Sequence, residues 1–454
     1  MTVSTINRLI ALFDGAFRAL APGLSMSDAE HMATLVHQSM SPSTRSYHTS
    51  DHVFDMCEGA NAIQTLAALF HDLVYFQLDG GFPAGVEHLL SDAVLERHGV
   101  ITIAPFSSDD EVMCLCTGIF GFGVGQSLSV YAGLNEFASA LVAGHQLHKH
   151  LRRSDLIGVL ACIEATIPFR NAVYKGESAP DLLAQRVRAV TQTHVLELVG
   201  VELDVHVAST MHDAVEFGNR DVRGFALANQ ALFLSNTWML IEESNAPLKV
   251  VGVYALSDYR GALMRMAGFL ANLDLASIFQ SYAGYPNDAT LDEWADAAGR
   301  NLRFACDYLD CKTASVAIIE ALARLTGNDS PVSMFLGDIS SLHGKPERVE
   351  DYLPETSPGP VLDEALLEVF VKGRARESRN DLTSSPLTAF VYRRIGQYGM
   401  RVAIVQARRM FDGLISPFEF LNTLDRDMVR AVVRACAMIA LSRREALLAL
   451  EKTL

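Results

Sequence analysis

Apolar residues recur every three or four positions along most of the 454-residue chain. That spacing places them on one face of an α-helix. Two clear examples are the stripe Met428, Val432, Ala435 and Ile439 and the stripe Met211, Val215, Val222 and Phe225. No segment alternates between apolar and polar residues for long enough to require a strand. The pattern therefore predicts an all-α fold.

Two of the segments that interrupt this helical pattern bear on domain organisation. Residues 337–360 are rich in Pro, Gly, Ser and charge, which is typical of a connector, and GYPND at 284–288 is a turn. We therefore expect an N-terminal helical domain over 1–285. A C-terminal helical region of unknown role follows over 286–454, interrupted by the connector.

Capping boxes predict where individual helices begin. A Ser or Thr followed three residues later by an acidic residue satisfies two unpaired backbone N–H groups at a helix start. Ser27 with Glu30 and Thr290 with Glu293 fit this rule.

Composition narrows the class of protein. Half of the residues are hydrophobic, so a large core is expected, and the net charge is −16 with a pI near 5.3. This charge argues against a nucleic-acid partner and against an anionic membrane surface. We find no N-terminal signal segment and no apolar run of ~20 residues that would span a membrane. The seven cysteines include no CxxC pair and are expected to be reduced, so we expect a cytoplasmic protein.

The candidate chemistry lies in two short segments, SYHTSDHVFDM at 46–56 and ALFHDLVYF at 68–76. His48 and His52 are four residues apart, which places them on one helix face. His71 and Asp72 follow in a largely apolar helical run. A buried carboxylate beside a buried imidazole is costly unless a positive group lies between them. We therefore expect His52, His71 and Asp72 to bind a metal ion.

Such a site needs another acidic ligand from later in the chain. The candidates are Asp213 and Asp221, eight residues apart in one helical segment. Asp213 lies nearer the start of its helix, where the helix dipole alone explains an acidic residue. That explanation does not cover Asp221, so we favour Asp221.

These residues resemble the HD superfamily of metal-dependent phosphohydrolases, over roughly residues 45–225. YHTSDHV is similar to the opening signature of cyclic-nucleotide phosphodiesterases, and IEATIPFR and NRDVRGF are similar to segments of uncharacterised bacterial HD proteins. The resemblance implies a helical bundle in which His52, His71, Asp72 and Asp221 bind one or two divalent ions (Mn, Mg, Fe, Ni, Co or Zn). It also implies that His48 is the general acid that protonates the leaving oxygen. The glutamine context that holds the nucleobase in phosphodiesterases has no counterpart in this chain.

Several further residues are candidates with weaker support. Arg170 and Arg220 could contact a substrate phosphate, because a guanidinium forms paired hydrogen bonds to its oxygens. His145 and His148 could hold a second metal, although a solvated helix end explains them better. Glu136 is an acidic residue in an apolar helix that could support the site or face solvent.

The expected function is hydrolysis of a phosphate ester, including a nucleotide-like one, by a metal-activated water. The expected partner is a small phosphorylated substrate. The sequence leaves open whether the protein forms a homodimer. Two alternatives remain: a di-iron oxygenase of HD type, which would use His145 and His148, and a non-catalytic signalling or scaffold protein with an HD domain.

Overall fold

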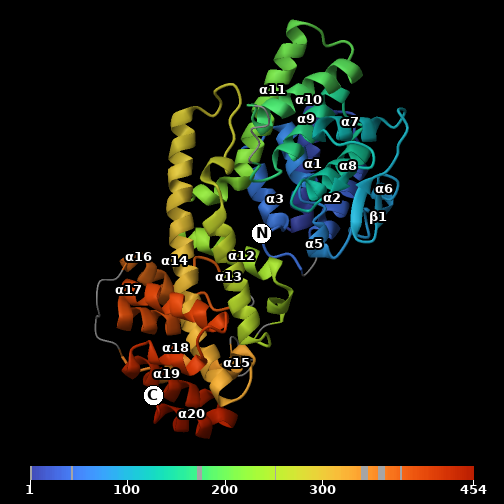
Figure 1. Ribbon diagram of the computed structural model, residues 1–454. Helices are drawn as coiled ribbons and strands as arrows, with labels where there is room; N and C mark the ends of the chain where they lie inside the picture. The colour runs from blue at the N-terminus through green and yellow to red at the C-terminus, as the bar shows by residue number, and fades with distance from the viewer. Residues whose placement is uncertain are drawn as a thin grey trace. The chain divides into compact units, whose positions relative to one another are not determined.

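The computed structural model describes residues 3–41, 44–170, 176–250, 252–338, 346–355, 363–378 and 381–454. Helices make up 67% of it and strands 4%, which confirms the all-α class (Figure 1). None of the helices in these ranges is both long and apolar enough to cross a membrane.

The chain forms two compact units, and each is discontinuous in sequence. Unit 1 contains Met1–Ala226 with Asp274–Ala297, and unit 2 contains Leu227–Leu273 with Ala298–Leu454. We expected one boundary near residue 285. Residues 227–273, which we assigned to the N-terminal domain, instead pack with unit 2.

Unit 1 is a helical bundle around a large apolar core. Its longer helices carry the buried leucines, valines and phenylalanines of that core. Its elements are α1 (Thr5–Leu20), α2 (Met26–Ser39), α3 (Ser50–Cys57), α4 (Ala62–Phe70), α5 (Phe76–Asp79), α6 (Glu87–Leu90), α7 (Glu111–Phe120), α8 (Leu134–Leu147), α9 (Arg153–Ala165), α10 (Ala179–His194), α11 (Val201–Asp221) and the 3-10 turns η1 (Val222–Ala226) and η3 (Leu275–Ser277).

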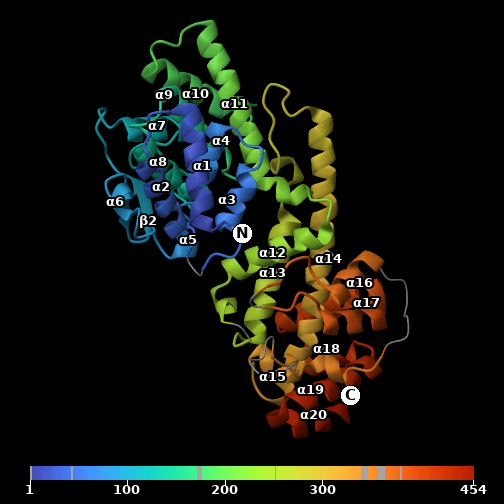
Figure 2. The same ribbon diagram turned by 180° about the vertical axis from the view of Figure 1, so that it is seen from behind.

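A close helix crossing positions the later half of unit 1. Helices α9 and α11 pack together so tightly at Gly218 that a Cβ there would lie 2.6 Å from the backbone oxygen of Ala165. Helix α11 also lies beside α3 and α4, as Figures 1 and 2 show from opposite sides. Segments more than a hundred residues apart therefore meet at one end of α11.

A small antiparallel sheet departs from the helical pattern. It contains β1 (Val94–Arg97), β2 (Val100–Ile103) and β3 (Ser127–Leu128) in that order. His98 and Gly99 join β1 to β2 with positive φ angles of 53° and 76°. Such a two-residue turn matches the twist of the strands.

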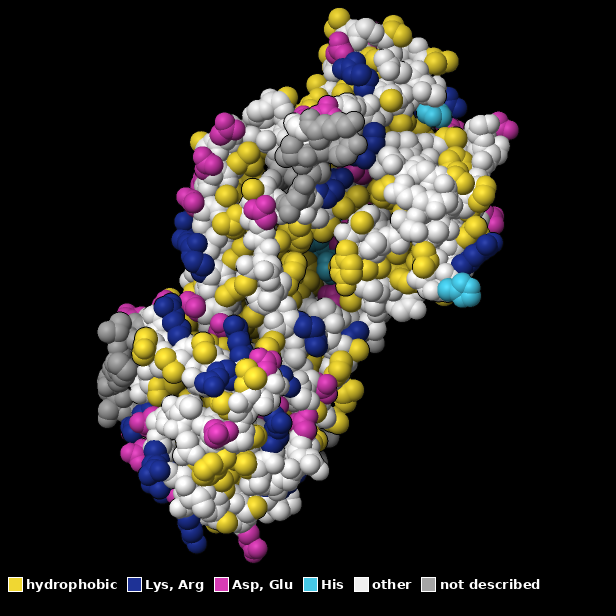
Figure 3. Space-filling view, in the orientation of Figure 1, with side chains coloured by type: hydrophobic (Ala, Val, Ile, Leu, Met, Phe, Trp, Pro, Cys, Tyr) yellow, Lys and Arg dark blue, Asp and Glu magenta, His cyan; other side chains and the backbone are white. Residues whose placement is uncertain are grey.

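Unit 2 holds the second group of helices. Over its C-terminal helices, the face shown in Figure 3 has positive and negative side chains interspersed. Its elements are α12 (Gln230–Ser244), η2 (Ala246–Lys249), α13 (Leu256–Asn272), most of α14 (Asp288–Thr326), α15 (Val332–Leu336), η4 (Val349–Tyr352), α16 (Glu364–Lys372), α17 (Pro386–Phe411), α18 (Pro417–Asn422), α19 (Arg426–Ile439), η5 (Leu441–Arg443) and α20 (Arg444–Glu451).

Both predicted capping boxes are wrong by two or three residues. Helix α2 begins after Ser25, whose side chain accepts from the backbone N–H of Asp28 in a capping box of its own. Helix α14 follows Asn287, whose side-chain oxygen accepts from the N–H of Thr290 at 3.0 Å. In each case another polar residue stands two or three positions upstream, and its side chain accepts the capping hydrogen bond. The predicted connector 337–360 contains η4, and parts of it lie outside the described residues.

Candidate metal centre

Three elements of unit 1 supply the site. His52 lies in the first turn of α3 and faces inward, where it is 9% exposed. His71 directly follows α4, which starts at a capping box formed by Asn61 and Gln64. Because the backbone of His71 continues the helix, its ring stays on the buried face of α4 and is 1% exposed. Asp221 is the last residue of α11.

The ligand atoms expected from the sequence converge. The Nε2 atoms of His52 and His71 are 3.3 Å apart, and Asp72 Oδ2 is 2.9 Å from the Nε2 of His71. Asp221 Oδ1 is 3.0 Å from the Nε2 of His52 and 3.8 Å from that of His71. His52, His71 and Asp72 therefore offer ligand atoms that all lie within 4.8 Å of one another, and Asp221 adds an oxygen beside the two histidines.

The hydrogen bond at Nδ1 of His71 determines what its Nε2 atom can do. The Nδ1 atom of His71 is 2.9 Å from the carbonyl oxygen of Ala68, which accepts its proton. The Nε2 of the neutral ring is then an acceptor. It faces Asp72 Oδ2, a buried atom with no hydrogen-bond partner among the described residues. With a neutral His71 the two facing atoms would both be acceptors, so the pair needs either a second proton on Nε2 or a metal ion between them. Imidazole with carboxylate suits a divalent metal.

The electrostatics agree with this geometry. Burial opposes charge on His71, but the nearby carboxylates of Asp72 and Asp221 raise its pKa well above the ordinary value. Burial would likewise raise the pKa of Asp72, yet the histidines outweigh it and lower that pKa. Hydrogen bonds from His52 and His71 overcome burial and lower the pKa of Asp221 to about 2. The carboxylates are therefore ionised and attract a cation.

Asp213 does not reach this centre. Its Oδ1 accepts a hydrogen bond of 2.9 Å from the side-chain amide of Asn61, at the start of α4. It instead forms a second group of possible ligands with His212 and Glu216, of which His212 is exposed. Glu216 is already paired with Arg220 and Gln64. The structure thus brings Asp221, and not Asp213, to the histidines.

His48 lies at the edge of the centre, in the bend before α3. Its ring centroid is 6.0 Å from that of His52 and 4.4 Å from that of Tyr75. Tyr47 also packs against His52, at 5.2 Å between centroids. The ring therefore packs beside His52 at the edge of the centre, where a proton donor to a bound substrate would be needed.

The two arginines expected to contact substrate are held by other residues. Arg170 forms two hydrogen bonds to the carboxylate of Glu164, at 2.5 and 3.1 Å, and Glu164 is completely buried. Arg220 donates to the carbonyl oxygen of Met56 at 3.0 Å and pairs with Glu216. Both guanidinium groups therefore have structural partners, which a local sequence motif does not reveal.

His145 and His148 do not extend the centre. They lie at the end of α8, and neither belongs to a group of three or more potential ligands within the described ranges. Glu136, in the first turn of α8, has a buried carboxyl oxygen without a hydrogen-bond partner in the described part of the chain. Burial raises its pKa to about 7, and Asp72 and Asp221 add to the effect.

Sequence reasoning missed Arg45. Its buried guanidinium donates to the backbone oxygens of Asp72 at 2.7 Å and Leu73 at 3.1 Å, and pairs with Asp79 at 2.6 Å. Arg45 thus fixes the turn that carries the His-Asp doublet. The sequence shows only that an arginine precedes the first histidine motif. It gives no sign that this arginine binds the backbone carbonyls of Asp72 and Leu73.

Comparison of the chain with protein-family models, curated proteins and solved structures finds no match.

Proposed function

We propose that unit 1 is a metal-dependent phosphohydrolase that cleaves a phosphate ester, with resemblance to the HD superfamily. One observation carries the proposal: the Nε2 atoms of His52 and His71 lie 3.3 Å apart, and each lies within 4 Å of a carboxylate oxygen of Asp72 and of Asp221. A divalent ion held there would supply a nucleophile, by lowering the pKa of a water molecule toward ~7.

The chain's own residues would divide the remaining work. His52, His71, Asp72 and Asp221 would hold the ion, and the bond from His71 to the carbonyl of Ala68 would fix the ring's orientation. His48, packed on Tyr75, would deliver a proton to the departing ester oxygen. Arg45 would keep the doublet in place through its backbone contacts.

The direct test is hydrolysis of an aryl phosphate monoester and an aryl phosphate diester, with Mn, Mg, Fe, Co and Ni supplied in turn. We expect turnover with at least one metal, loss of turnover with a chelator, and recovery when the metal is restored. His71→Ala should reduce turnover at least about 100-fold, because it removes a ligand. Asp213→Asn is the matched control and should retain turnover. No hydrolysis by protein that metal analysis shows to be loaded would reject the proposal.

A further inference from the structure

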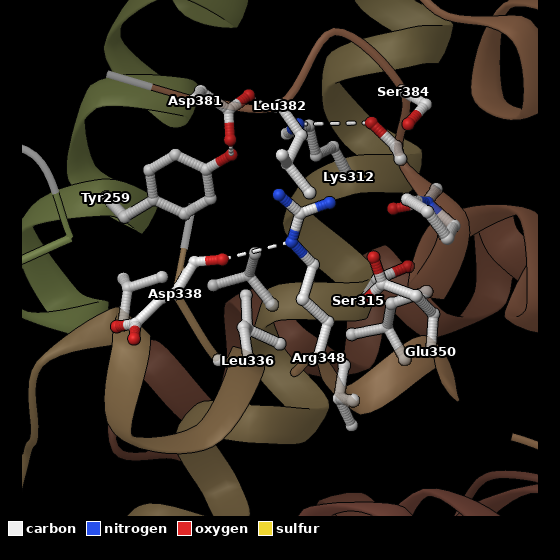
Figure 4. Close-up of a pocket in the computed structure, with 18 residues that line it drawn as sticks. Tyr259, Lys312, Ser315, Leu336, Asp338, Arg348, Glu350, Asp381, Leu382 and Ser384 are labelled. Carbon is white, nitrogen blue, oxygen red and sulfur yellow. Dashed lines mark hydrogen bonds and ion pairs between the residues drawn. The ribbon is translucent and has the colours of Figure 1, made fainter. Parts of the chain in front are cut away.

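Unit 2 contains a pocket that the proposed hydrolase does not use. Its cavity volume is about 70 Å³, and it opens to solvent (Figure 4). Six of its eighteen lining residues are valines and leucines: Val316, Val332, Leu336, Val349, Leu382 and Leu387. Polar groups enter from α14, from η4 and from the start of α17. An apolar wall with a few convergent polar groups is typical of a small-molecule site.

A buried ammonium group forms one end of this pocket. Lys312 is 5% exposed, and its Nζ donates to Asp381 at 2.9 Å and to the hydroxyl of Ser385 at 3.1 Å. The same nitrogen lies 4.6 Å from the ring centroid of Trp238. Figure 4 shows the guanidinium of Arg348 reaching into the pocket toward this end.

The carboxylate beside Lys312 already has other partners. Asp381 also accepts from Arg374 at 3.3 Å and from the hydroxyl of Tyr259 at 3.0 Å. Two buried cations therefore share one carboxylate. Asp338 and Glu350 line the pocket as well, so the lining as a whole carries no large excess of positive charge. This balance suits a ligand with one negative charge better than one with two.

The first turn of α17 adds unpaired donors. Its N-cap residue, Ser385, makes no side-chain capping bond, because its hydroxyl is engaged with Lys312 and Tyr308. Among the described residues, the backbone N–H groups of Leu387 and Thr388 have no hydrogen-bond partner. Such groups at a helix start attract anions.

Thr388 offers a further polar group to the pocket. It lines the pocket and is 3% exposed as a whole residue, and no residue in the described ranges forms a hydrogen bond with its hydroxyl. The hydroxyl and the two N–H groups are therefore available to a ligand that enters the pocket.

We propose that the pocket binds a small organic carboxylate. The carboxylate group accepts hydrogen bonds from the first turn of α17, from the Thr388 hydroxyl and from Lys312. The carbon chain lies against the valine and leucine wall. This site is independent of the proposed hydrolase, because all of its residues belong to unit 2.

The test is a calorimetric titration of the metal-free full-length protein with hexanoate. We expect saturable binding of one hexanoate per chain. Acetate should bind at least about tenfold more weakly, because each buried CH₂ contributes roughly a fourfold change in affinity. An alkyl phosphonate of the same length, titrated at a pH high enough for it to carry two charges, should also bind more weakly than hexanoate at that pH.

Two threonine variants provide a matched pair. Thr388→Val removes the hydroxyl at nearly constant shape and should weaken hexanoate binding about fivefold to tenfold. Thr313→Val is the control, because Thr313 is 1% exposed with an equally unpaired hydroxyl but does not line the pocket. It should bind hexanoate as the unaltered protein does.

Each of the following binding results would overturn the assignment: no saturable binding, equal affinity for acetate and hexanoate, equal effects of the two threonine variants, or tighter binding of the phosphonate. The His71→Ala variant separates the two sites, since it should lose hydrolysis and still bind hexanoate. Loss of hexanoate binding in that variant would place the ligand in unit 1 and reject the pocket.

Discussion

The side chains of the candidate metal centre stabilise one another only if a cation is present. His71 Nε2 and Asp72 Oδ2 lie 2.9 Å apart, and the proton on Nδ1 of His71 is already used by Ala68. A proton on Nε2 can occupy this gap, and the raised pKa of His71 shows that the carboxylates favour it. A divalent ion would satisfy all four ligand atoms at once, whereas a proton satisfies two.

Asp221 and Asp213 should respond differently to loss of charge. Asp221→Asn should keep the fold and lower the metal content of the purified protein, because its Oδ1 is 3.0 Å from His52. Asp213→Asn should leave metal content nearly unchanged, since Asp213 is bonded to Asn61. Elemental analysis of both variants makes the comparison. The opposite result would move the acidic ligand to Asp213 and leave the histidine pair intact.

His48 should affect turnover and not metal retention. His48→Ala removes a ring that packs on Tyr75 but is not among the four converging ligands. We expect full metal content and a fall of ~10²–10⁴-fold in kcat, the usual contribution of a general acid. Steady-state kinetics with elemental analysis on the same sample test this. A His48→Ala protein without metal would make His48 a ligand and remove the proposed proton donor.

Metal affinity should increase with pH. A ligating imidazole must be unprotonated, and the pKa of His71 is raised well above its ordinary value by Asp72 and Asp221, despite burial. Below that raised pKa a proton competes with the metal at Nε2, and above it the competition ends. Affinity should therefore rise about tenfold per pH unit below the raised pKa and then level off. Competition with a chromophoric chelator over a pH series measures this, and a flat profile would contradict it.

At the scale of elements, the crossing of α9 and α11 determines where Asp221 lies. Gly218 stands three residues before Asp221, and a Cβ on it would meet the backbone of Ala165 at 2.6 Å. Backbone atoms cannot yield as a flexible side chain can. A side chain at this position must therefore push the end of α11 away from α9 and from the histidines.

Gly218→Ala should accordingly destabilise unit 1 by roughly 1–3 kcal/mol and reduce metal binding. Gly15→Ala, in α1 of the same unit, is the control, because nothing lies within 4 Å of its added Cβ. The control should raise stability by up to about 1 kcal/mol, since alanine is the better helix former. Thermal unfolding and metal analysis compare the two variants. Equal stability for both would show that α9 and α11 tolerate separation.

At the scale of the whole molecule, each unit is assembled from separate parts of the sequence. Helices α12 and α13 belong with residues after 298, although α11 and η1 precede them directly. Several contacts show this, including a hydrogen bond between Tyr259 and Asp381 and an ion pair between Arg260 and Glu320. Trp238 is 2% exposed beneath Lys312 and Arg374.

A truncated chain that ends at Tyr285 should therefore expose apolar surface and aggregate. It would retain α12 and α13 but lose the residues that cover Trp238 and Leu263, both nearly inaccessible in the full chain. We expect aggregation on size-exclusion chromatography and strong binding of a hydrophobic dye. The full chain is the control. A monomeric, dye-silent product would show that the N-terminal region to residue 285 folds without unit 2.

The sequence by itself determined the helical class. The spacing of apolar residues is a local property, and a spacing of three or four residues matches the roughly 3.6-residue repeat of the helix. The sequence also identified His52, His71 and Asp72 as a group, since their separations follow from one short helical hairpin, and it favoured Asp221 over Asp213. Their role as metal ligands stays a prediction. Cap positions were missed by two or three residues, because neighbouring polar residues compete for one cap and local pattern does not rank them.

Only the tertiary structure decided which distant residues meet. Arg170 pairs with Glu164, and Arg45 binds the backbone carbonyl of Asp72 in the His-Asp doublet. Residues 227–273 pack with the C-terminal helices. The tertiary structure also formed the pocket at the start of α17 from α13, α14, η4 and the segment before α17. These contacts depend on how helix faces pack across long stretches of chain. A periodic pattern predicts which face of a helix is buried. It does not predict which residues of other helices pack against that face.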